Sequence, residues 1–164
     1  MNVRALIVAL LALIVLRCNV DAAPYPADMQ PYLKPVNTVL AAMANHDEHG
    51  FAAAYARDAI IIDTQAPYRW SGSTAPIDWL SALSTFGKLR YARFTALGNP
   101  MQVTRDENNA YVTVLGALRG LGAKSGLRQN VLLTFTLREV NGGWKISSQS
   151  WTDVPPVFTL SLKS

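Results

Sequence analysis

The feature that most constrains this chain is a long alternating segment near its C-terminus, Leu127–Val140. From Val131 to Leu137 apolar side chains occupy every second position, which is the period of a strand that buries one face. Asn141-Gly142 follows, and this dipeptide is the strongest short signal for a tight turn between two strands. We expect the partner strand over Trp144–Asp153. The chain is therefore predicted to contain a sheet of long antiparallel strands.

Three helices and several shorter strands are expected before this hairpin. Apolar residues recur at helical spacing over Val36–Asn45 and over Ser73–Gly87, where Ile77, Leu80 and Leu83 are expected to form the buried stripe. Asp47 is a suitable N-cap for a helix over Glu48–Ala56. Further strands are expected over Ala59–Asp63, Leu89–Leu97, Met101–Arg105 and Ala110–Arg119. This order predicts an α+β fold, with three N-terminal helices packed on one face of a strongly curved, mostly antiparallel sheet.

The N-terminus has the pattern of a signal peptide. Met1–Arg4 carries one positive charge, and Ala5–Leu16 is an unbroken apolar run, too short to cross a bilayer comfortably. We expect cleavage after Ala22, export to the periplasm or the medium, and no stable membrane anchor afterwards. The alternative is a lipoprotein acylated at Cys18, but Arg17 stands where a small residue is required.

The expected layout has four parts. Residues 1–22 form the signal peptide, residues 23–35 a Pro-rich extended lead-in, residues 36–154 one folded domain, and residues 155–164 a C-terminal tail. Cleavage would remove Cys18, which is the only cysteine of the sequence. The mature chain is therefore expected to have no disulfide, no thiolate nucleophile and no cysteine metal ligand.

The charge of the chain is mild. Its formal net charge is +4, and only 16% of its residues are charged, without a block of five or more like charges. Basic residues lie closest together at Lys88, Arg90 and Arg93, with Arg119, Lys124 and Arg128 further along. We interpret them as solvated faces of strands, and we expect no nucleic-acid partner.

Two histidines lie in the expected junction between the first two helices. His46 and His49 flank Asp47 and Glu48, a spacing that would suit a metal ion. Helix ends of this composition are ordinary, however, and the mature chain offers neither a cysteine nor a third histidine to complete the ligands. We therefore expect no metal and no other cofactor.

The stretch Ala59–Gly72 is where chemistry is most expected. It begins as a very apolar strand and that strand ends in a carboxylate, Asp63, before a Pro-containing turn and a Trp-Ser-Gly step. A carboxylate in such a place can serve as a general base in an apolar pocket. In the alternative interpretation Asp63 only starts the turn, because aspartate bonds its own backbone well there.

This strand is apolar on both of its faces. Ile60 and Ile62 point to one side, and Ile61 and Asp63 point to the other. A strand with two apolar faces is usually covered on both sides. We therefore expect a homodimer that pairs through the outer face of the sheet.

Four short motifs accompany this order of elements: Tyr55-Ala56-Arg57-Asp58-Ala59, then Asp63, then Ser71-Gly72, and finally Trp151-Thr152-Asp153-Val154. Together they resemble the nuclear transport factor 2-like superfamily, in particular its secreted bacterial SnoaL-like (polyketide cyclase-like) members. The resemblance covers roughly residues 36–154 and implies a cone-shaped fold. That fold hosts enzymes, ligand binders and non-catalytic dimerisation modules alike.

The resemblance also implies roles for individual residues. Asp63 lies where the steroid isomerases of the superfamily keep their general base, and the side chains of Tyr55, Trp79 and Trp151 lie where those enzymes line their cavity. The two donors that would stabilise an oxyanion are missing, because Val39 and Thr134 stand at their positions. Losing one such donor costs about 3–4 kcal/mol of transition-state stabilisation, so classical steroid isomerisation is not expected.

Two further residues are candidates from the sequence itself. Phe86 is interpreted as part of an aromatic lining or of the core, and Thr134 as a hydroxyl offered to a ligand or to solvent. The expected ligand-binding residues are therefore Tyr55, Trp79, Phe86, Thr134 and Trp151.

Three functions remain open from the sequence. The first is a binding protein that holds a small hydrophobic molecule in an aromatic-lined pocket. The second is an acid/base enzyme, namely an isomerase, cyclase, dehydratase or hydrolase, that uses Asp63 as its catalytic residue. The third is a non-catalytic dimerisation or assembly module whose interior is filled by its own side chains.

Overall fold

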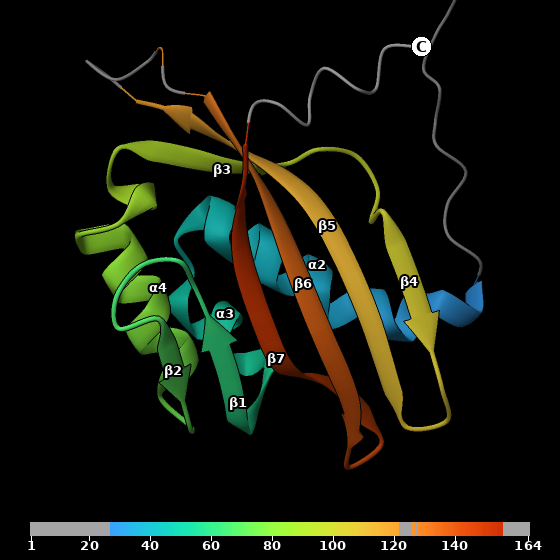
Figure 1. The fold of residues 1–164 in the computed structure, drawn as a ribbon. Helices are drawn as coiled ribbons and strands as arrows, with labels where there is room; N and C mark the ends of the chain where they lie inside the picture. Colours follow the sequence, from blue (N-terminus) through green and yellow to red (C-terminus); the bar gives the residue numbers. More distant parts are fainter. Residues whose placement is uncertain (1–26, 122–125, 127, 156–164) are drawn as a thin grey trace, which may run out of the picture.

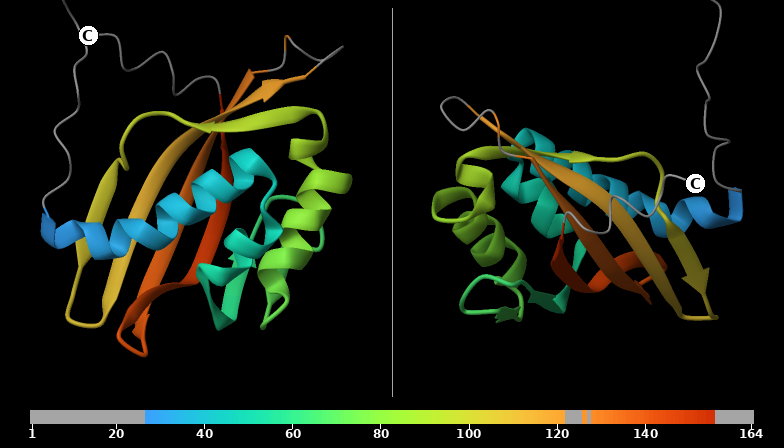
Figure 2. Two further views of the ribbon diagram at one scale, coloured as in Figure 1. Left: turned by 180° about the vertical axis from the view of Figure 1, so that it is seen from behind. Right: turned by 45° about the horizontal axis from the view of Figure 1, so that its top comes forward.

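Seven strands in one curved sheet carry three helices on their concave face (Figures 1 and 2). The computed structural model describes residues 27–121, 126 and 128–155. The expected signal peptide, the first residues of the Pro-rich segment and residues 156–164 lie outside this range. In chain order the elements are η1 (Ala27–Met29), α2 (Gln30–Asn45), α3 (Glu48–Ala53), β1 (Tyr55–Ile62), β2 (Arg69–Ser71), α4 (Ala75–Thr85), η2 (Lys88–Arg90), β3 (Ala92–Ala96), β4 (Gln102–Arg105), β5 (Asn109–Gly120), β6 (Arg128–Val140) and β7 (Gly143–Val154).

The strand order confirms the predicted fold class. The sheet runs β2-β1-β7-β6-β5-β3, and β4 also pairs with β5. The strands pair antiparallel except for β1 and β7, which are parallel and bring the early part of the chain beside its last strand. The large sheet is therefore mostly antiparallel, as the alternation and the hairpin signal indicate.

The predicted hairpin is present. Asn141 and Gly142 both have left-handed backbone conformations, with φ of 53° and 75°, and Val140 pairs with Gly143 across the turn. Two consecutive left-handed residues make the kind of two-residue turn that matches the twist of the flanking strands. The register of β6 against β7 is thereby set at the turn.

The core lies between the helices and the inner face of the sheet. On β6 the inward residues are Val131, Leu133, Phe135 and Leu137, all fully buried. Helix α2 turns Leu33, Val36, Val39 and Met43 toward them. These residues follow the helical spacing that buries one stripe against a sheet.

Helix α4 buries Leu80 and Leu83 of the predicted stripe, but not Ile77. Pro76, Trp79, Leu80 and Leu83 are buried at positions i, i+3, i+4 and i+7. Ile77, which was expected in the stripe, is 41% exposed. The expectation was wrong because Trp79 fills the place facing the sheet, and Ile77 lies two positions away on the helix surface.

Two boundaries also differ from the prediction. The Pro-rich segment was expected to be extended up to residue 35, yet the chain is helical from Ala27 onward. Pro31 lies in the first turn of α2, where its missing N–H is not needed. Strand β1 begins at Tyr55 rather than Ala59, because its first residues pair with β7 across an irregular register.

Candidate functional site

Asp63 directly follows β1, and its carboxylate is completely buried. Its inward orientation agrees with the predicted alternation, since Ile61 is also fully buried on the same face. One carboxylate oxygen, Oδ2, accepts a hydrogen bond from the indole Nε1 of Trp79 at 2.9 Å. The other, Oδ1, accepts from the backbone N–H of Gln65 at 3.1 Å, as in an aspartate-started turn. The carboxylate thus stabilises the turn through its hydrogen bond with Gln65, and it also faces the interior.

Lys88 is the cation beside this carboxylate. Its Nζ lies 3.7 Å from Oδ1 of Asp63 and 2.7 Å from Oδ1 of Asp153. It also donates to the hydroxyl of Thr64 at 3.1 Å and lies 5.3 Å from the ring centroid of Trp151. We call these five residues the Lys88 cluster. It combines two carboxylates with one ammonium, and the side chains of Lys88 and Asp153 are 18% and 35% exposed.

A row of aromatic rings extends inward from this cluster. The centroid distances are 5.1 Å from Tyr55 to Phe51, 5.7 Å from Phe51 to Trp79 and 5.8 Å from Trp79 to Trp151. Phe94 continues the row, 6.0 Å from Trp151. These spacings are those of favourable aromatic pairs. All five side chains are buried, so the row forms an apolar interior between helices and sheet.

Gln149 is a polar side chain within this interior. It is 1% exposed and lies on β7, two residues before Trp151. The hydroxyl of Tyr55 donates to its Oε1, while its Nε2 has no hydrogen-bond partner. Burial raises the pKa of the Tyr55 hydroxyl well above its usual value. An unpaired buried donor costs about 1–3 kcal/mol, so this amide is a buried polar group whose hydrogen bonding is incomplete.

The structure brings together four of the sequence-predicted site residues: Asp63, Tyr55, Trp79 and Trp151. It does not bring the other two to them. Phe86 is 78% exposed just after the last turn of α4, so the expectation that it joins the lining or the core was wrong. Thr134 alternates with the buried Leu133 and Phe135, which places its side chain on the outer face of the sheet, away from the interior.

Sequence reasoning missed several residues of the site, among them Gln149, Asp153 and Lys88. Gln149 and Asp153 each lie two positions from Trp151 on β7, so the alternation of that strand was a signal for both. Lys88 gave no local signal. It reaches the cluster only because α4 and the turn after it fold back over the end of the sheet (Figure 1).

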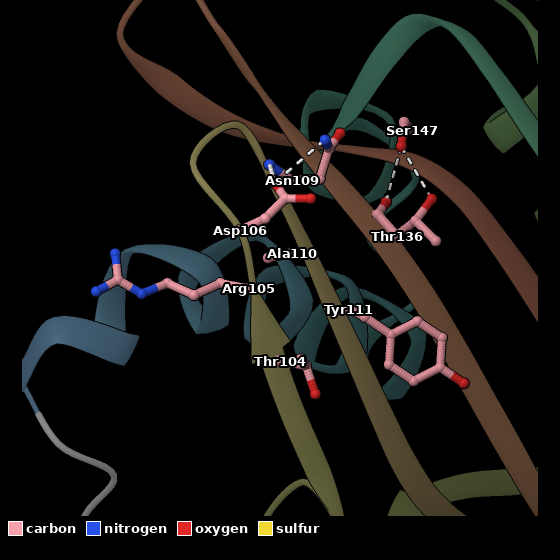
Figure 3. Close-up of a pocket in the computed structure, with 8 residues that line it drawn as sticks. All are labelled: Thr104, Arg105, Asp106, Asn109, Ala110, Tyr111, Thr136 and Ser147. Atoms are coloured by element: carbon pink, nitrogen blue, oxygen red, sulfur yellow. Dashed lines mark hydrogen bonds between the residues drawn. The ribbon is translucent and has the colours of Figure 1, made fainter.

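A separate hollow of about 430 Å³ lies over β4, β5 and the neighbouring strands (Figure 3). Its polar groups are engaged in local structure. Arg105 turns away from the other side chains and donates to the hydroxyl of Tyr32 at 2.8 Å, and Thr136 bonds Ser147. Backbone hydrogen bonds from the turn, that of Asn109 first, lower the pKa of Asp106. Because these groups do not converge on one point, we do not place the site here.

Within residues 27–121, 126 and 128–155, no three side chains of histidine, cysteine, aspartate or glutamate lie close enough together to hold a metal ion. In the same part of the chain no helix is long and apolar enough to cross a membrane.

Comparison with known proteins gives a family and a fold. A model of the SnoaL-like domain matches residues 34–152. The chain is similar to a ketosteroid isomerase-like protein from Erwinia carotovora atroseptica, at 15% identity and a TM-score of 0.65, over 80% of this chain and 100% of that one. It is also similar to an NTF2-like protein with a cystatin-like fold from Novosphingobium aromaticivorans, at 11% identity and a TM-score of 0.64, over 99% and 98% of the two chains. No curated protein sequence matches the chain significantly. At such identities the solved structures support the fold alone.

The Lys88 cluster predicts a stability effect. Breaking one side of a buried ion pair costs about 3–5 kcal/mol. Because Lys88 is partly exposed and Asp63 keeps its other hydrogen bonds, we expect Lys88→Met to lower the free energy of unfolding by about 2–3 kcal/mol in urea titrations. Lys34→Met, at an exposed position of α2, is the matched control and should have little effect. Equal losses in the two variants would contradict the role of the cluster.

Tyr55 predicts a pH effect. Its folded-state pKa lies above the unfolded value of about 10, so folding favours the neutral hydroxyl. This contribution is present below the unfolded pKa and is lost as the pH rises toward the folded pKa, at about 1.4 kcal/mol per pH unit. Tyr55→Phe should be less stable than wild type near neutral pH, and the gap should narrow above about pH 10. A gap that stays constant across alkaline urea titrations would contradict this.

Proposed function

The chain belongs to the SnoaL-like domain family, and within that family we propose that it binds one small, mostly apolar molecule without converting it chemically. The observation that carries the proposal is the unpaired end of the buried Gln149 amide. Folded proteins rarely leave such a group without a partner, and those that do usually hold an unseen water or ligand there.

The surroundings of Gln149 define the class of molecule. Small-molecule sites are mostly apolar and aromatic, with a few polar groups that fix orientation. The aromatic row from Tyr55 to Phe94 supplies the first property, and the amide of Gln149 with the hydroxyl of Tyr55 supplies the second. A ligand that fits both is apolar and carries one hydrogen-bonding oxygen, such as a ketone or an alcohol. Its oxygen would meet the free end of the amide.

The Lys88 cluster is the route of access that we propose. Trp151 belongs both to the cluster and to the aromatic row, and the side chains of Lys88 and Asp153 reach solvent. The lysine side chain is long and has several rotatable bonds. Its outward rotation would uncover Trp151 without a change in the backbone.

Acid/base catalysis by Asp63 is less well supported by the geometry. A general base must reach the proton that it removes, directly or through one water. The carboxylate of Asp63 has no exposed area, and both of its oxygens accept fixed hydrogen bonds. The two positions that would have to stabilise an oxyanion provide no hydrogen-bond donor to the interior, since Val39 is apolar and Thr134 lies on the outer face.

We also propose that the protein is exported and that two copies pair through the outer face of the sheet. The central rows of that face pair hydroxyl and apolar side chains across strands, without a charge: Thr113–Thr134–Ser150, Tyr111–Thr136–Ser148 and Leu115–Leu132–Thr152. Ile62 of the nearby β1 is 51% exposed. A surface with few charges and an exposed isoleucine suits a self-complementary contact.

Native mass spectrometry of the protein purified from its producing organism tests this proposal. We expect the wild-type protein to retain a small molecule and to have twice the mass of one chain. The double variant Tyr55→Phe/Gln149→Leu should lose the molecule. It replaces both hydrogen-bonding partners by apolar groups of similar shape, so its unfolding free energy should change little. Thr134→Val alters the outer face of the same sheet and is the matched control, which should keep the ligand.

Other spectra would overturn parts of the proposal. A molecule retained only by Asp63→Asn would show that the wild-type protein converts it, and the enzyme hypothesis would stand instead. Protein that carries no molecule in any form would reject the binding function and favour the assembly module. A single-chain mass for the wild type would reject the dimer.

A further inference from the structure

Three arginines form a row across three neighbouring strands. Arg93 of β3 pairs directly with Arg119 of β5, and Arg119 pairs directly with Arg128 of β6. Directly opposite residues of antiparallel strands share one face and have their Cβ atoms about 5 Å apart. We call these three residues the arginine row.

The row lies on the outer face of the sheet. Its neighbours in sequence, Ala92, Phe94 and Leu118, are buried on the inner face, while all three arginines are exposed. The row lies beyond the end of the proposed dimer surface. Arg128 precedes Leu132, the nearest residue of that surface on β6, by four residues, which corresponds to about 13 Å of strand.

The strands that carry the row have no negative charge near it, and Asp153 of the neighbouring β7 pairs with the inward Val131 and with Lys88. Strands β3 and β5 contain neither aspartate nor glutamate, and the one acidic residue of β6, Glu139, is at its opposite end. The basic residues found in ion pairs within the described part of the chain are Lys88, Arg105 and Arg138, none of which belongs to the row.

Three like charges in register are unfavourable for folding. Like charges directly opposite each other destabilise a sheet. From the sequence these arginines were expected to lie on solvated strand faces. Because they are directly paired across three strands, their charges repel one another more strongly than charges at scattered positions would. Such an arrangement is relieved by anions that bind several guanidinium groups at once, for example phosphate groups.

The surroundings of the row indicate which anionic partner it meets. The end of β5 and the start of β6 project beyond the helices at the top of Figure 1. At this end Tyr91 is 43% exposed with the guanidinium of Arg90 over its ring, and Leu121 is 48% exposed and bonds the backbone of Tyr91. Exposed tyrosine and leucine beside cationic groups suit the boundary between lipid headgroups and acyl chains. A soluble polyanion would make no use of them.

From this placement we propose that the arginine row, with Tyr91 and Leu121, docks the protein reversibly on an anionic phospholipid surface. Each arginine near such a surface increases binding by about fivefold. The three arginines together give a membrane association that salt weakens. This association is much weaker than that of a membrane-spanning helix or a lipid anchor.

Vesicle flotation with the full chain tests the proposal. We expect wild-type protein to bind phosphatidylcholine vesicles that contain about 30% phosphatidylglycerol more tightly than vesicles of phosphatidylcholine alone, and salt to remove the difference. Arg119→Gln should weaken binding to the anionic vesicles about fivefold, and neutralising all three arginines about 100-fold. Every variant is purified as its producing organism exports it, so all of them are processed alike.

Two controls make the test specific. Arg69→Gln removes the same charge from β2, at the opposite edge of the sheet, and should leave vesicle binding within twofold of wild type. Leu121→Gln should weaken binding without changing its dependence on salt, because it removes apolar contact and no charge. Thermal unfolding should show Arg119→Gln at least as stable as wild type, since repulsion within the row falls.

Three results would overturn the proposal. Equal losses for Arg69→Gln and Arg119→Gln would show that only net charge matters. Equal binding to anionic and neutral vesicles would remove the role of the row altogether. The protein could instead bind inorganic polyphosphate more tightly than anionic vesicles, with Leu121→Gln binding polyphosphate as wild type does. That result would assign the row to a soluble polyanion.

Discussion

The buried carboxylate of Asp63 links helix α4 and the η2 turn to the sheet. Asp63 at the end of β1 accepts a hydrogen bond from Trp79 of α4 and lies beside Lys88, which in turn reaches Asp153 near the end of β7. A buried charge without partners would cost several kcal/mol. Asp63 can be buried because these contacts stabilise its carboxylate. They hold α4 against the sheet and give Trp79 its place in the aromatic row.

The contacts of Asp63 show that its place in the fold does not by itself define its chemical role. By resemblance, the position of Asp63 is that of a general base in the steroid isomerases of the superfamily. In this chain the indole of Trp79 and the backbone of Gln65 donate hydrogen bonds to the two carboxylate oxygens. These contacts give Asp63 a structural task here. A fold positions residues, but the surrounding side chains decide what those residues can do.

Features that depend on nearby residues could be predicted from the sequence. The Asn141-Gly142 turn, the Asp47 cap and the inward side of Asp63 follow from local backbone preferences and from the two-residue period of strands. The position of Lys88 could not be predicted in this way, because it depends on how α4 folds back over a strand that is 65 residues away in sequence. Thr134 was misplaced among the ligand-binding residues. Its alternation with Leu133 and Phe135 already assigns it to the outer face, which fits the alternative of a hydroxyl offered to solvent and excludes a place in the interior.

The two faces of the sheet each contain a departure from the rules that stabilise folded chains, and Nε of Arg138 is a further buried atom without a hydrogen-bond partner. On the inner face the amide of Gln149 lacks a partner, and on the outer face three arginines repel one another. Natural sequences keep such local costs mainly where function requires them. The two departures share no residue and lie on opposite faces of the sheet, so neither is a by-product of the other. We therefore propose separate partners for them, a small molecule inside and an anionic surface outside, in addition to the proposed second copy of the chain.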